Sequence, residues 1–371
     1  MKTVNGYEVI QVFESFSPKN LAMEGDKIGL QIGNLNRKVQ NVMIALDVLE
    51  EVVDEAIQKD VQLIIAHHPP IFRPLAKITA DNPTGRLIEK LIKHDIAVYA
   101  AHTNLDVAVG GVNDLLAEAL GLKDAEVLVP TFEIGLKKLA VFVPKTHEHL
   151  VREAIGKVGA GSIGNYKYCS FTSNGTGRFL PGEHAKPYVG ESGRLEDVEE
   201  VKIETIYPEH LEKKVLSAMI KAHPYEEVAY DLYRLDNKGE TLGLGRVGYV
   251  DEISLRDFVE VLKTALEVKK VRVVGDLDAK VKKVAVLGGD GNKYFPNAIY
   301  KGADVYVTGD FYYHTAHDAA AQGLNVIDPG HNIEKVMKKG VAKTLTQAFL
   351  EREYEINVFP SEIDTDPFQF V

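Results

Sequence analysis

Histidines and carboxylates gather at three places in this 371-residue chain, each soon after a short apolar run. Imidazole nitrogens together with carboxylate oxygens bind divalent metals such as zinc, manganese, iron, cobalt and nickel. The positions of these side chains therefore predict a metal site and metal-assisted chemistry. The five predicted ligands are His67, His68, Asp106, His331 and Glu334.

The adjacent pair His67-His68 bears on the number of ions. Successive side chains of a strand point to opposite faces, so neighbouring histidines are expected to hold different ions. Five ligands suffice for one closed site, whereas two tetrahedral sites would need bridging carboxylates and water. Two ions about 3.5–4 Å apart are the arrangement with which hydrolases generate hydroxide and stabilise an oxyanion. We expect two divalent ions, zinc foremost, and keep a single ion as the competing interpretation.

Two further histidines are candidates for handling protons. His102 directly follows the apolar run 96–101, and His314 lies beside a predicted helix at 315–322. Either could orient a metal ligand or relay a proton. The plainer interpretation is that each is a hydrogen-bonded core or surface residue.

Strands alternate with helices in both the N-terminal and the C-terminal part of the chain, which indicates parallel sheets covered on both faces. The N-terminal part has predicted strands at 41–48, 61–66 and 96–101 and helices at 49–59, 84–93 and 112–120. The C-terminal part has predicted strands at 283–288, 304–309 and 325–328 and helices at 295–301, 315–322 and 332–352. Ligands of such sheets lie beyond the carboxyl ends of the strands, where the five predicted metal ligands fall.

The two α/β parts look like copies of one unit. Ile44 and Ile65 are 21 positions apart, and Val286 and Val307 are also 21 apart. A third predicted strand follows in each part, at 96–101 and at 325–328. An internal duplication is therefore expected, although any two βαβ units share some of this spacing.

The middle of the chain, from Lys137 to about Leu235, has a different pattern. Its predicted order β-α-β-β-α-β suits a ferredoxin-like α+β domain. Within it, strands are expected in 166–172 and in 177–180. The predicted organisation is a first α/β lobe at 1–130, an inserted domain at 131–238 and a second, similar α/β lobe at 239–371.

Composition restricts the class of protein. The net charge of −11 disfavours binding to nucleic acid or to anionic membranes. The single cysteine, Cys169, rules out an intrachain disulfide and a cysteine-rich metal site. No apolar string approaches the ~18 residues that a membrane span needs. A soluble protein of the cytoplasm is expected.

Four motifs together carry a resemblance to a known family. They are Ala66-His67-His68-Pro69-Pro70-Ile71-Phe72, His102-Thr103-Asn104-Leu105-Asp106 followed by Gly110-Gly111-Val112-Asn113-Asp114, Thr308-Gly309-Asp310 with His314, and Asp328-Pro329-Gly330-His331-Asn332-Ile333-Glu334. Across nearly the whole chain they resemble the GTP cyclohydrolase 1 type 2 homologues, the Nif-like proteins with a dinuclear metal centre. Shorter members place the glutamate four residues after the histidine, whereas Glu334 comes three after His331.

The resemblance implies a two-lobed α/β core, a dinuclear centre held by the five ligands above, and a toroidal homohexamer of two stacked trimers. The insertion resembles PII and CutA modules, with His223-Pro224-Tyr225-Glu226 similar to a CutA signature. The resemblance to the GTP cyclohydrolase 1 type 2 homologues also implies a metal-dependent hydrolase that acts on GTP, another nucleotide or a related small molecule.

Two other functions compete with hydrolysis. One is a non-catalytic scaffold that senses a metal or an effector through the insertion. The other is the threading of nucleic acid through a ring, which the negative charge disfavours.

Overall fold

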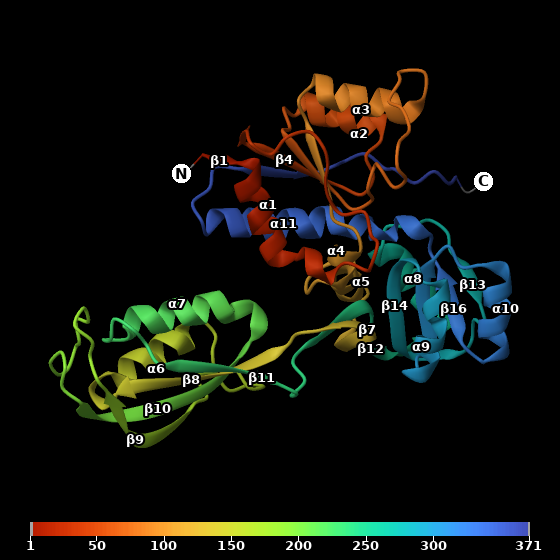
Figure 1. Cartoon of the computed structure of the whole chain (residues 1–371). Helices are drawn as coiled ribbons and strands as arrows, with labels where there is room; N and C mark the ends of the chain where they lie inside the picture. The colour runs from red at the N-terminus through yellow and green to blue at the C-terminus, as the bar shows by residue number, and fades with distance from the viewer. Residues whose placement is uncertain (1–2, 370–371) are drawn as a thin grey trace. The chain divides into compact units, whose positions relative to one another are not determined.

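The structure is a computed structural model that describes residues 3–369. This part of the chain divides into two compact units. Unit 1 combines the residues up to Phe132 with those from Leu242 onward, and unit 2 is Glu133–Thr241. The elements of both units are labelled in Figure 1.

The first sheet of unit 1 has the strand order β17-β4-β5-β6-β2. Its strands are β17 (Asn357–Pro360), β4 (Asn41–Ala45), β5 (Leu63–Ala66), β6 (Ala97–Ala100) and β2 (Gly29–Ile32). β2 is antiparallel to β6, and the other neighbours are parallel. Helices α2 (Glu50–Gln58) and α3 (Pro83–Lys93) cover one face, and α1 (Gly6–Phe16) and α11 (Val336–Leu350) lie on the other (Figure 1).

Side chains of β4 alternate between two apolar layers. Val42 and Ile44 belong to the core that includes α1 and α11, whereas Met43 and Ala45 pack with α2 and α3. All four are fully buried. A strand with both faces covered has no polar alternation, which is why the sequence reads as an unbroken apolar run.

The second sheet of unit 1 has the order β13-β16-β15-β14-β12-β7. These strands are β13 (Arg272–Val274), β16 (Asn325–Asp328), β15 (Val305–Gly309), β14 (Lys280–Asp290), β12 (Thr241–Ser254) and β7 (Lys123–Glu133). β14, β15 and β16 are parallel, and β12 and β13 are antiparallel to their neighbours β14 and β16. Helices α5 (Val112–Ala119) and α8 (Leu255–Ala265) contact β14, whereas α9 (Phe295–Tyr300) contacts β15 and α10 (Tyr313–Ala321) contacts β16.

One apolar core joins the two sheets. Met337, Val341 and Leu345 of α11 lie in the same buried cluster as Ile44 of the first sheet and Val307 of the second. Each such side chain contributes about 1.5–3 kcal/mol when fully buried. This shared core fixes the carboxyl ends of both sets of parallel strands relative to each other.

Two features of unit 1 differ from the predictions. The helix expected at 332–352 begins as a 3-10 helix, η5 (His331–Lys335), before α11. Two edge strands also belong to a different sheet from their neighbours in sequence. β17, from the C-terminal part of the chain, pairs with β4 of the first sheet, and β7, from the N-terminal part, lies in the second sheet. The boundaries 1–130 and 239–371 therefore do not separate the two sheets strand by strand.

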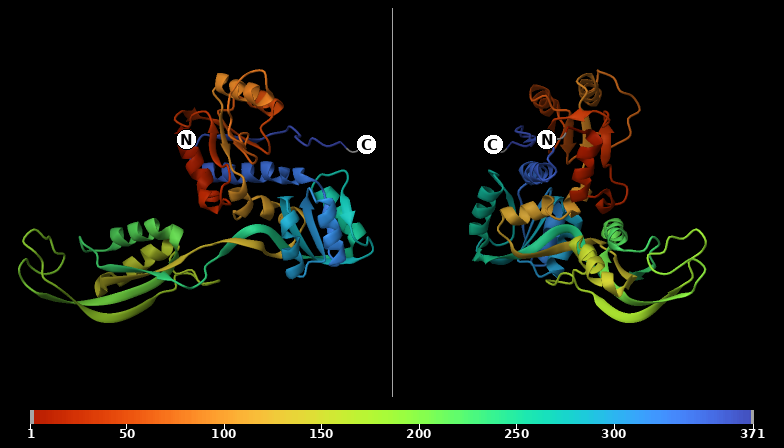
Figure 2. Two further views of the ribbon diagram at one scale, coloured as in Figure 1. Left: turned by 45° about the vertical axis from the view of Figure 1, so that its right-hand side comes forward. Right: turned by 90° about the vertical axis from the view of Figure 1, so that its left-hand side faces the viewer.

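Unit 2 has the element order β8-α6-β9-β10-α7-β11. Its bounds are β8 (Leu136–Pro144), α6 (Glu148–Lys157), β9 (Phe171–Phe179), β10 (Glu196–Pro208), α7 (Glu212–Ala222) and β11 (Tyr230–Leu235). The sheet order is β11-β8-β10-β9 with antiparallel neighbours, and both helices lie on one face (Figure 2). In place of the two strands expected in 166–172 and 177–180, the structure has one strand, β9, and residues 166–170 lie outside it. It lies at the sheet edge, where Gly175 and Gly177 are tolerated.

The remaining short elements are β1 (Val4–Asn5), β3 (Lys38–Val39), η1 (Lys19–Leu21), α4 (Thr103–Val107), η2 (Lys145–His147), η3 (Glu209–Leu211) and η4 (Asn292–Tyr294). Within residues 3–369, none of the helices combines the length and apolar character needed to cross a membrane.

Candidate metal centre

His67 and His68 follow β5 directly. Their backbone N–H groups continue the pairing with the first sheet, to the carbonyls of Ala45 and Leu46 at 3.0 and 2.9 Å. The two rings do not diverge as strand alternation predicts, because β5 ends at Ala66. Their centroids are 4.9 Å apart. The two side chains therefore belong to one cluster.

Each of these rings is held at Nδ1. Nδ1 of His67 lies 3.0 Å from the carbonyl of Ala101, and Nδ1 of His68 lies 2.7 Å from Asp47 Oδ1. An acceptor at Nδ1 holds a proton there, which is the arrangement that lets Nε2 act as a metal ligand when an ion replaces the proton on Nε2. Nε2 of both rings faces Glu334 Oε2, at 3.7 Å from His67 and 3.0 Å from His68.

His102 has the same arrangement. It precedes α4, and its Nδ1 lies 2.8 Å from Oδ1 of Asp26. The other oxygen of Asp26 accepts from Thr103 N at 2.9 Å and from the Thr103 hydroxyl. The His102 ring is 5.3 Å from that of His67 and 5.9 Å from that of His68. His102 is therefore part of the cluster, with its own carboxylate partner.

Asp106 lies one helical turn after His102, which brings both to the same side of α4. It is 8% exposed, and its Oδ1 is 3.6 Å from Nε2 of His67. Its carbonyl accepts from the amide of Asn113 at 3.0 Å, and the amide oxygen of Asn113 accepts from Gly288 N at 3.0 Å. The buried Asn113 thus ties Asp106 to β14 of the second sheet.

His331 and Glu334 come from the second sheet side, after β16. In a 3-10 helix residues three apart eclipse each other, so η5 brings the two side chains to one face. Nε2 of His331 lies 3.2 Å from Glu334 Oε2. The spacing of three residues therefore suits the 3-10 geometry, as a spacing of four suits an α-helix.

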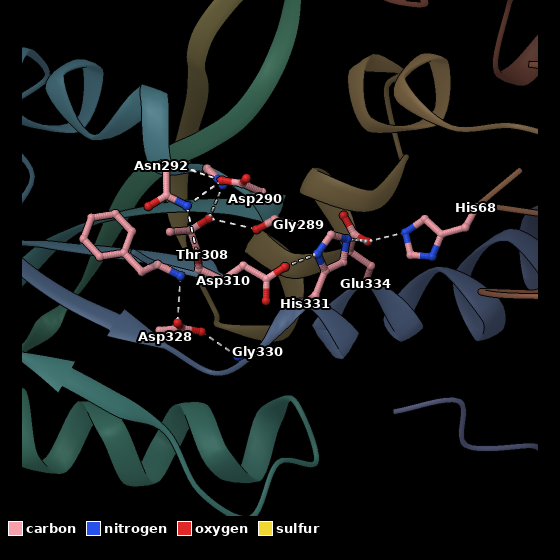
Figure 3. Close-up of polar contacts among 12 residues, drawn as sticks. His68, Gly289, Asp290, Asn292, Thr308, Asp310, Asp328, Gly330, His331 and Glu334 are labelled. Atoms are coloured by element: carbon pink, nitrogen blue, oxygen red, sulfur yellow. Dashed lines mark hydrogen bonds and ion pairs between the residues drawn. The ribbon is translucent and has the colours of Figure 1, made fainter. Parts of the chain in front are cut away.

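A polar network behind His331 holds its orientation (Figure 3). Nδ1 of His331 lies 2.8 Å from Asp310 Oδ2. Asp310 has a left-handed backbone with φ +52°, an uncommon conformation for a residue with a side chain. The amide of Asn292 donates to its carbonyl at 2.8 Å, and the next residue, Phe311, donates its N–H to Asp328 at 2.9 Å. These contacts keep the Asp310 carboxylate aimed at the imidazole.

Gly289 leaves room for this cluster. It has φ +67°, and a Cβ there would lie 2.7 Å from Glu334 Oε1 and 3.3 Å from His331 Nε2. Only glycine combines this conformation with this close approach. The end of β14, within the Gly288–Asn292 run, therefore lies directly against the cluster.

The carboxylates of the cluster have shifted pKa values, and two buried atoms of the cluster lack a hydrogen-bond partner among residues 3–369. Burial raises the pKa of Asp106 to about 6. Burial alone would also raise the pKa of Glu334, but His67, His331 and His68 outweigh it and lower that pKa well below its usual value. Within the described chain, Nε2 of His67 and Oδ1 of Asp106 are buried without a hydrogen-bond partner. Each such atom costs about 1–3 kcal/mol unless something binds it.

The cluster divides into three overlapping groups whose ligand atoms lie within 4.8 Å of one another. They are His67-Asp106-Glu334, His68-His331-Glu334 and His67-His68-His102. All five predicted metal ligands are thus brought together, and His67, His68 and Glu334 each belong to two groups. The structure adds His102 beside them.

Four other residues differ in how they relate to the cluster and in how well the sequence indicates them. His314 is exposed on α10 and is in none of the three groups, so its role in proton transfer stays a prediction. Asp47 and Asp310 follow strands, which sequence can indicate, but their pairing with histidines is a matter of geometry. Asp26 lies in a loop and gives no signal in the sequence.

Comparisons with known proteins find relatives that match nearly the whole chain. The family model for Duf34/NIF3 (NGG1p interacting factor 3) matches residues 4–367. A Bacillus subtilis protein named "GTP cyclohydrolase 1 type 2 homolog" is 61% identical over 371 residues, covering all of both chains. A Listeria innocua protein of the same name is 52% identical over 372 residues, again covering both chains fully.

Two solved structures are similar over their full length and that of this chain. The crystal structure of a Bacillus cereus protein related to NIF3 has 61% identity and a TM-score of 0.95, with 100% of both chains covered. Staphylococcus aureus protein SA1388 has 34% identity and a TM-score of 0.76, also with 100% of both chains covered.

Proposed function

Because the chain belongs to the Duf34/NIF3 family, we propose that its histidine and carboxylate cluster holds two divalent metal ions and that the loaded protein is a hydrolase. The observation that carries the proposal is that Glu334 Oε2 faces three imidazole nitrogens, those of His67, His68 and His331, at 3.0–3.7 Å. Zinc is the metal we expect first, with manganese, iron, cobalt or nickel as alternatives.

The residues fit such ions. A cation would satisfy the buried Nε2 of His67 and Oδ1 of Asp106, which have no hydrogen-bond partner among the described residues. It would also offset the burial of the Asp106 and Glu334 carboxylates, which is costly for uncompensated charges. A neutral polar core would instead pair these atoms with one another at hydrogen-bond distance.

The ligand groups suggest which residues would hold each ion. His67 and Asp106 would hold one, His68 and His331 the other, and Glu334 would be shared. His102 would be a further ligand beside His67 and His68. Its Nδ1 is held by Asp26, which leaves Nε2 for the metal. This adds His102 to the five predicted ligands. His314, which lies outside the cluster, is then the remaining candidate for proton transfer.

Two ions so held would lower the pKa of water and stabilise negative charge that develops on a substrate. The chain's own residues prepare this chemistry. Asp26, Asp47 and Asp310 fix the tautomer and orientation of three imidazoles. Rings that are already oriented lose little rotational freedom when a metal binds.

The substrate we propose is GTP or another nucleotide, following the name of the B. subtilis relative. The test is turnover by metal-loaded protein on GTP, a nucleotide panel and phosphoesters, with product detected by chromatography. His68→Ala should abolish turnover, and His149→Ala, on the surface of unit 2, should not. Turnover that persists in His68→Ala would contradict the assignment.

A second candidate is a non-catalytic sensing scaffold, in which unit 2 reads an effector. Its support is the order β8-α6-β9-β10-α7-β11 with sheet order β11-β8-β10-β9, which suits a ferredoxin-like module of the PII or CutA type. This candidate expects ligand binding without product, and binding lost on deletion of residues 137–235. Unchanged binding after that deletion would count against it.

We further propose a core of two pseudo-duplicated lobes, near 1–130 and 239–371, around an insertion near 131–238. Support comes from the three parallel strands β4-β5-β6 and β14-β15-β16.

The chain would assemble in the cytoplasm as a homohexamer of two stacked trimers. Native mass spectrometry should then give six times the 41.0 kDa of one chain.

A further inference from the structure

Unit 2 contains a cavity that is independent of the metal centre. It has a volume of 940 Å³ and is lined by the end of β9, by the segment 180–188 and by residues that follow α7. Small-molecule sites usually have about 300–1,000 Å³. The cavity is therefore large enough for a ligand with an extended body.

A buried carboxylate lines this cavity. Glu200 of β10 is only 9% exposed, and its Oε1 accepts a hydrogen bond from the Tyr225 hydroxyl at 3.0 Å. Gly177 on the adjacent edge strand makes room for it, because a Cβ there would lie 2.2 Å from Glu200 Oε2. A buried negative charge with one neutral partner is costly unless a cation approaches it.

Aromatic rings surround the same space. Phe179, Tyr188 and Tyr225 all line the cavity, with ring centroids of Phe179 and Tyr188 at 5.8 and 6.2 Å from that of Tyr225. They come from β9, from the segment 180–188 and from the residues after α7, so three separate parts of the fold meet here. Aromatic faces attract organic cations through their quadrupoles.

His223 holds Tyr225 in place. Its Nδ1 accepts from the backbone N–H of Tyr225 at 3.1 Å, and its Nε2 donates to the carbonyl of Phe142 at 2.9 Å. Burial lowers the pKa of His223, which keeps this ring neutral and in one tautomer. The Tyr225 ring and its contact with Glu200 are thus pre-formed.

The charge of the lining is negative. Besides Glu200, the lining includes Glu183, Glu226 and Glu227. Among the lining residues of the described chain there is no lysine, and Arg178 is paired with Asp197 at 2.7 Å. Such a lining repels phosphate groups and attracts cations.

We propose that this cavity binds an organic cation, in which an ammonium or guanidinium group pairs with Glu200 and an apolar body packs against Phe179, Tyr188 and Tyr225. The carboxylate supplies a charge-assisted hydrogen bond or ion pair, and the rings supply cation–π contacts. The inference gives the effector of the second candidate function a chemical class. It rests on unit 2 alone and holds whether or not the metal centre is catalytic.

The test is isothermal titration calorimetry of the full-length protein with choline, phenethylammonium and agmatine, up to about 10 mM. At least one of the three is expected to bind saturably. For choline the matched probe is 3,3-dimethylbutan-1-ol, which has the same shape without the charge. The neutral probe should bind about tenfold or more weakly than choline if choline binds.

Glu200→Gln should weaken the binding of the cation about tenfold, because it removes the charge and keeps the shape. Glu199→Gln is the matched control, since it removes one charge from the same strand on the opposite face. It should leave binding within about twofold. Both variants should keep the metal content of the wild type, which separates this result from a failure of the metal-centre proposal.

Three results would overturn the inference. They are the absence of saturable binding by all three cations, equal binding of choline and its neutral probe, and unchanged binding in a folded Glu200→Gln protein. If Glu200→Gln does not fold, the probes on wild-type protein still decide the matter. Among them, binding of agmatine or phenethylammonium supports the inference only if sodium chloride weakens it.

Discussion

Glu334 Oε2 lies 3.0 Å from His68 Nε2, although the two residues are 266 positions apart and follow strands of different sheets. The same oxygen lies 3.2 Å from Nε2 of His331 and 3.7 Å from Nε2 of His67. One carboxylate thus meets imidazoles from both sheets of unit 1. The core shared through α11 makes this meeting possible.

Because Glu334 belongs to two ligand groups, its loss should affect both ions. We predict that Glu334→Gln binds neither ion stably, whereas Asp106→Asn loses one and keeps the other. Metal content measured by mass spectrometry of purified variants checks this. Glu89→Gln, on the surface of α3, is the control and should match the wild type. Equal loss in the Asp106 and Glu334 variants would show that the ions are not held as proposed.

Asp26, Asp47 and Asp310 are predicted to act through the histidines that they orient. Asp26→Asn should weaken metal binding about 10–100-fold without removing a ligand, by loosening His102. Competition with a chelator gives the affinity, and zinc-free thermal stability shows whether folding is affected. An unchanged affinity in Asp26→Asn would mean that His102 takes no part in the site.

Gly289→Ala should exclude the metal by crowding Glu334. Its matched control is Gly121→Ala, because Gly121 has nearly the same backbone, φ +69°, with nothing within 4 Å of a Cβ. Both variants should lose about 1–2 kcal/mol of stability from the left-handed conformation. Only Gly289→Ala should also lose metal, measured as ions per chain. Equal metal content in the two variants would refute the crowding argument.

Glu55 should make stability depend on pH. Its carboxylate accepts from Lys59 Nζ, from the Ser361 hydroxyl and from the Glu362 backbone N–H. Burial alone would raise its pKa, but these hydrogen bonds outweigh it and lower the pKa below 4.5. A group with a lowered folded pKa stabilises the protein above its unfolded pKa and loses that effect as pH falls through the folded value.

Glu55→Gln is therefore predicted to cost about 1–3 kcal/mol at pH 7. The difference from wild type should shrink below pH 4.5, the ordinary value for this carboxyl. Urea unfolding at several pH values measures it. Glu51→Gln, exposed on the same helix, should stay within about 0.5 kcal/mol of wild type. A Glu55→Gln effect that persists unchanged at low pH would contradict this reasoning.

The parallel strands were accessible from sequence because their apolar runs are local. Asn41–Ala45 and Leu63–Ala66 fall within the predicted strands, since a strand buried on both faces needs only consecutive apolar residues. The pairing of β17 with β4 was not accessible. It joins Asn357 to Asn41, and no local pattern specifies a partner so far along the chain.

The proposed ligands likewise have a clearer signal in the sequence than the residues that orient them. His67, His68 and Glu334 are of ligand types and follow strands, which the sequence shows. Asp26 is one acidic residue among many in a loop, and only the fold brings it to His102. The 3-10 turn of η5 also comes from the structure, and it explains the spacing of His331 and Glu334.

The most direct test of the central claim is anomalous X-ray scattering, at several absorption edges, from crystals of carefully purified, unstripped protein. We expect two ions per chain, one beside His67 and Asp106 and one beside His68 and His331, with Glu334 in contact with both. Crystals in which no stoichiometric ion lies among these side chains would contradict it.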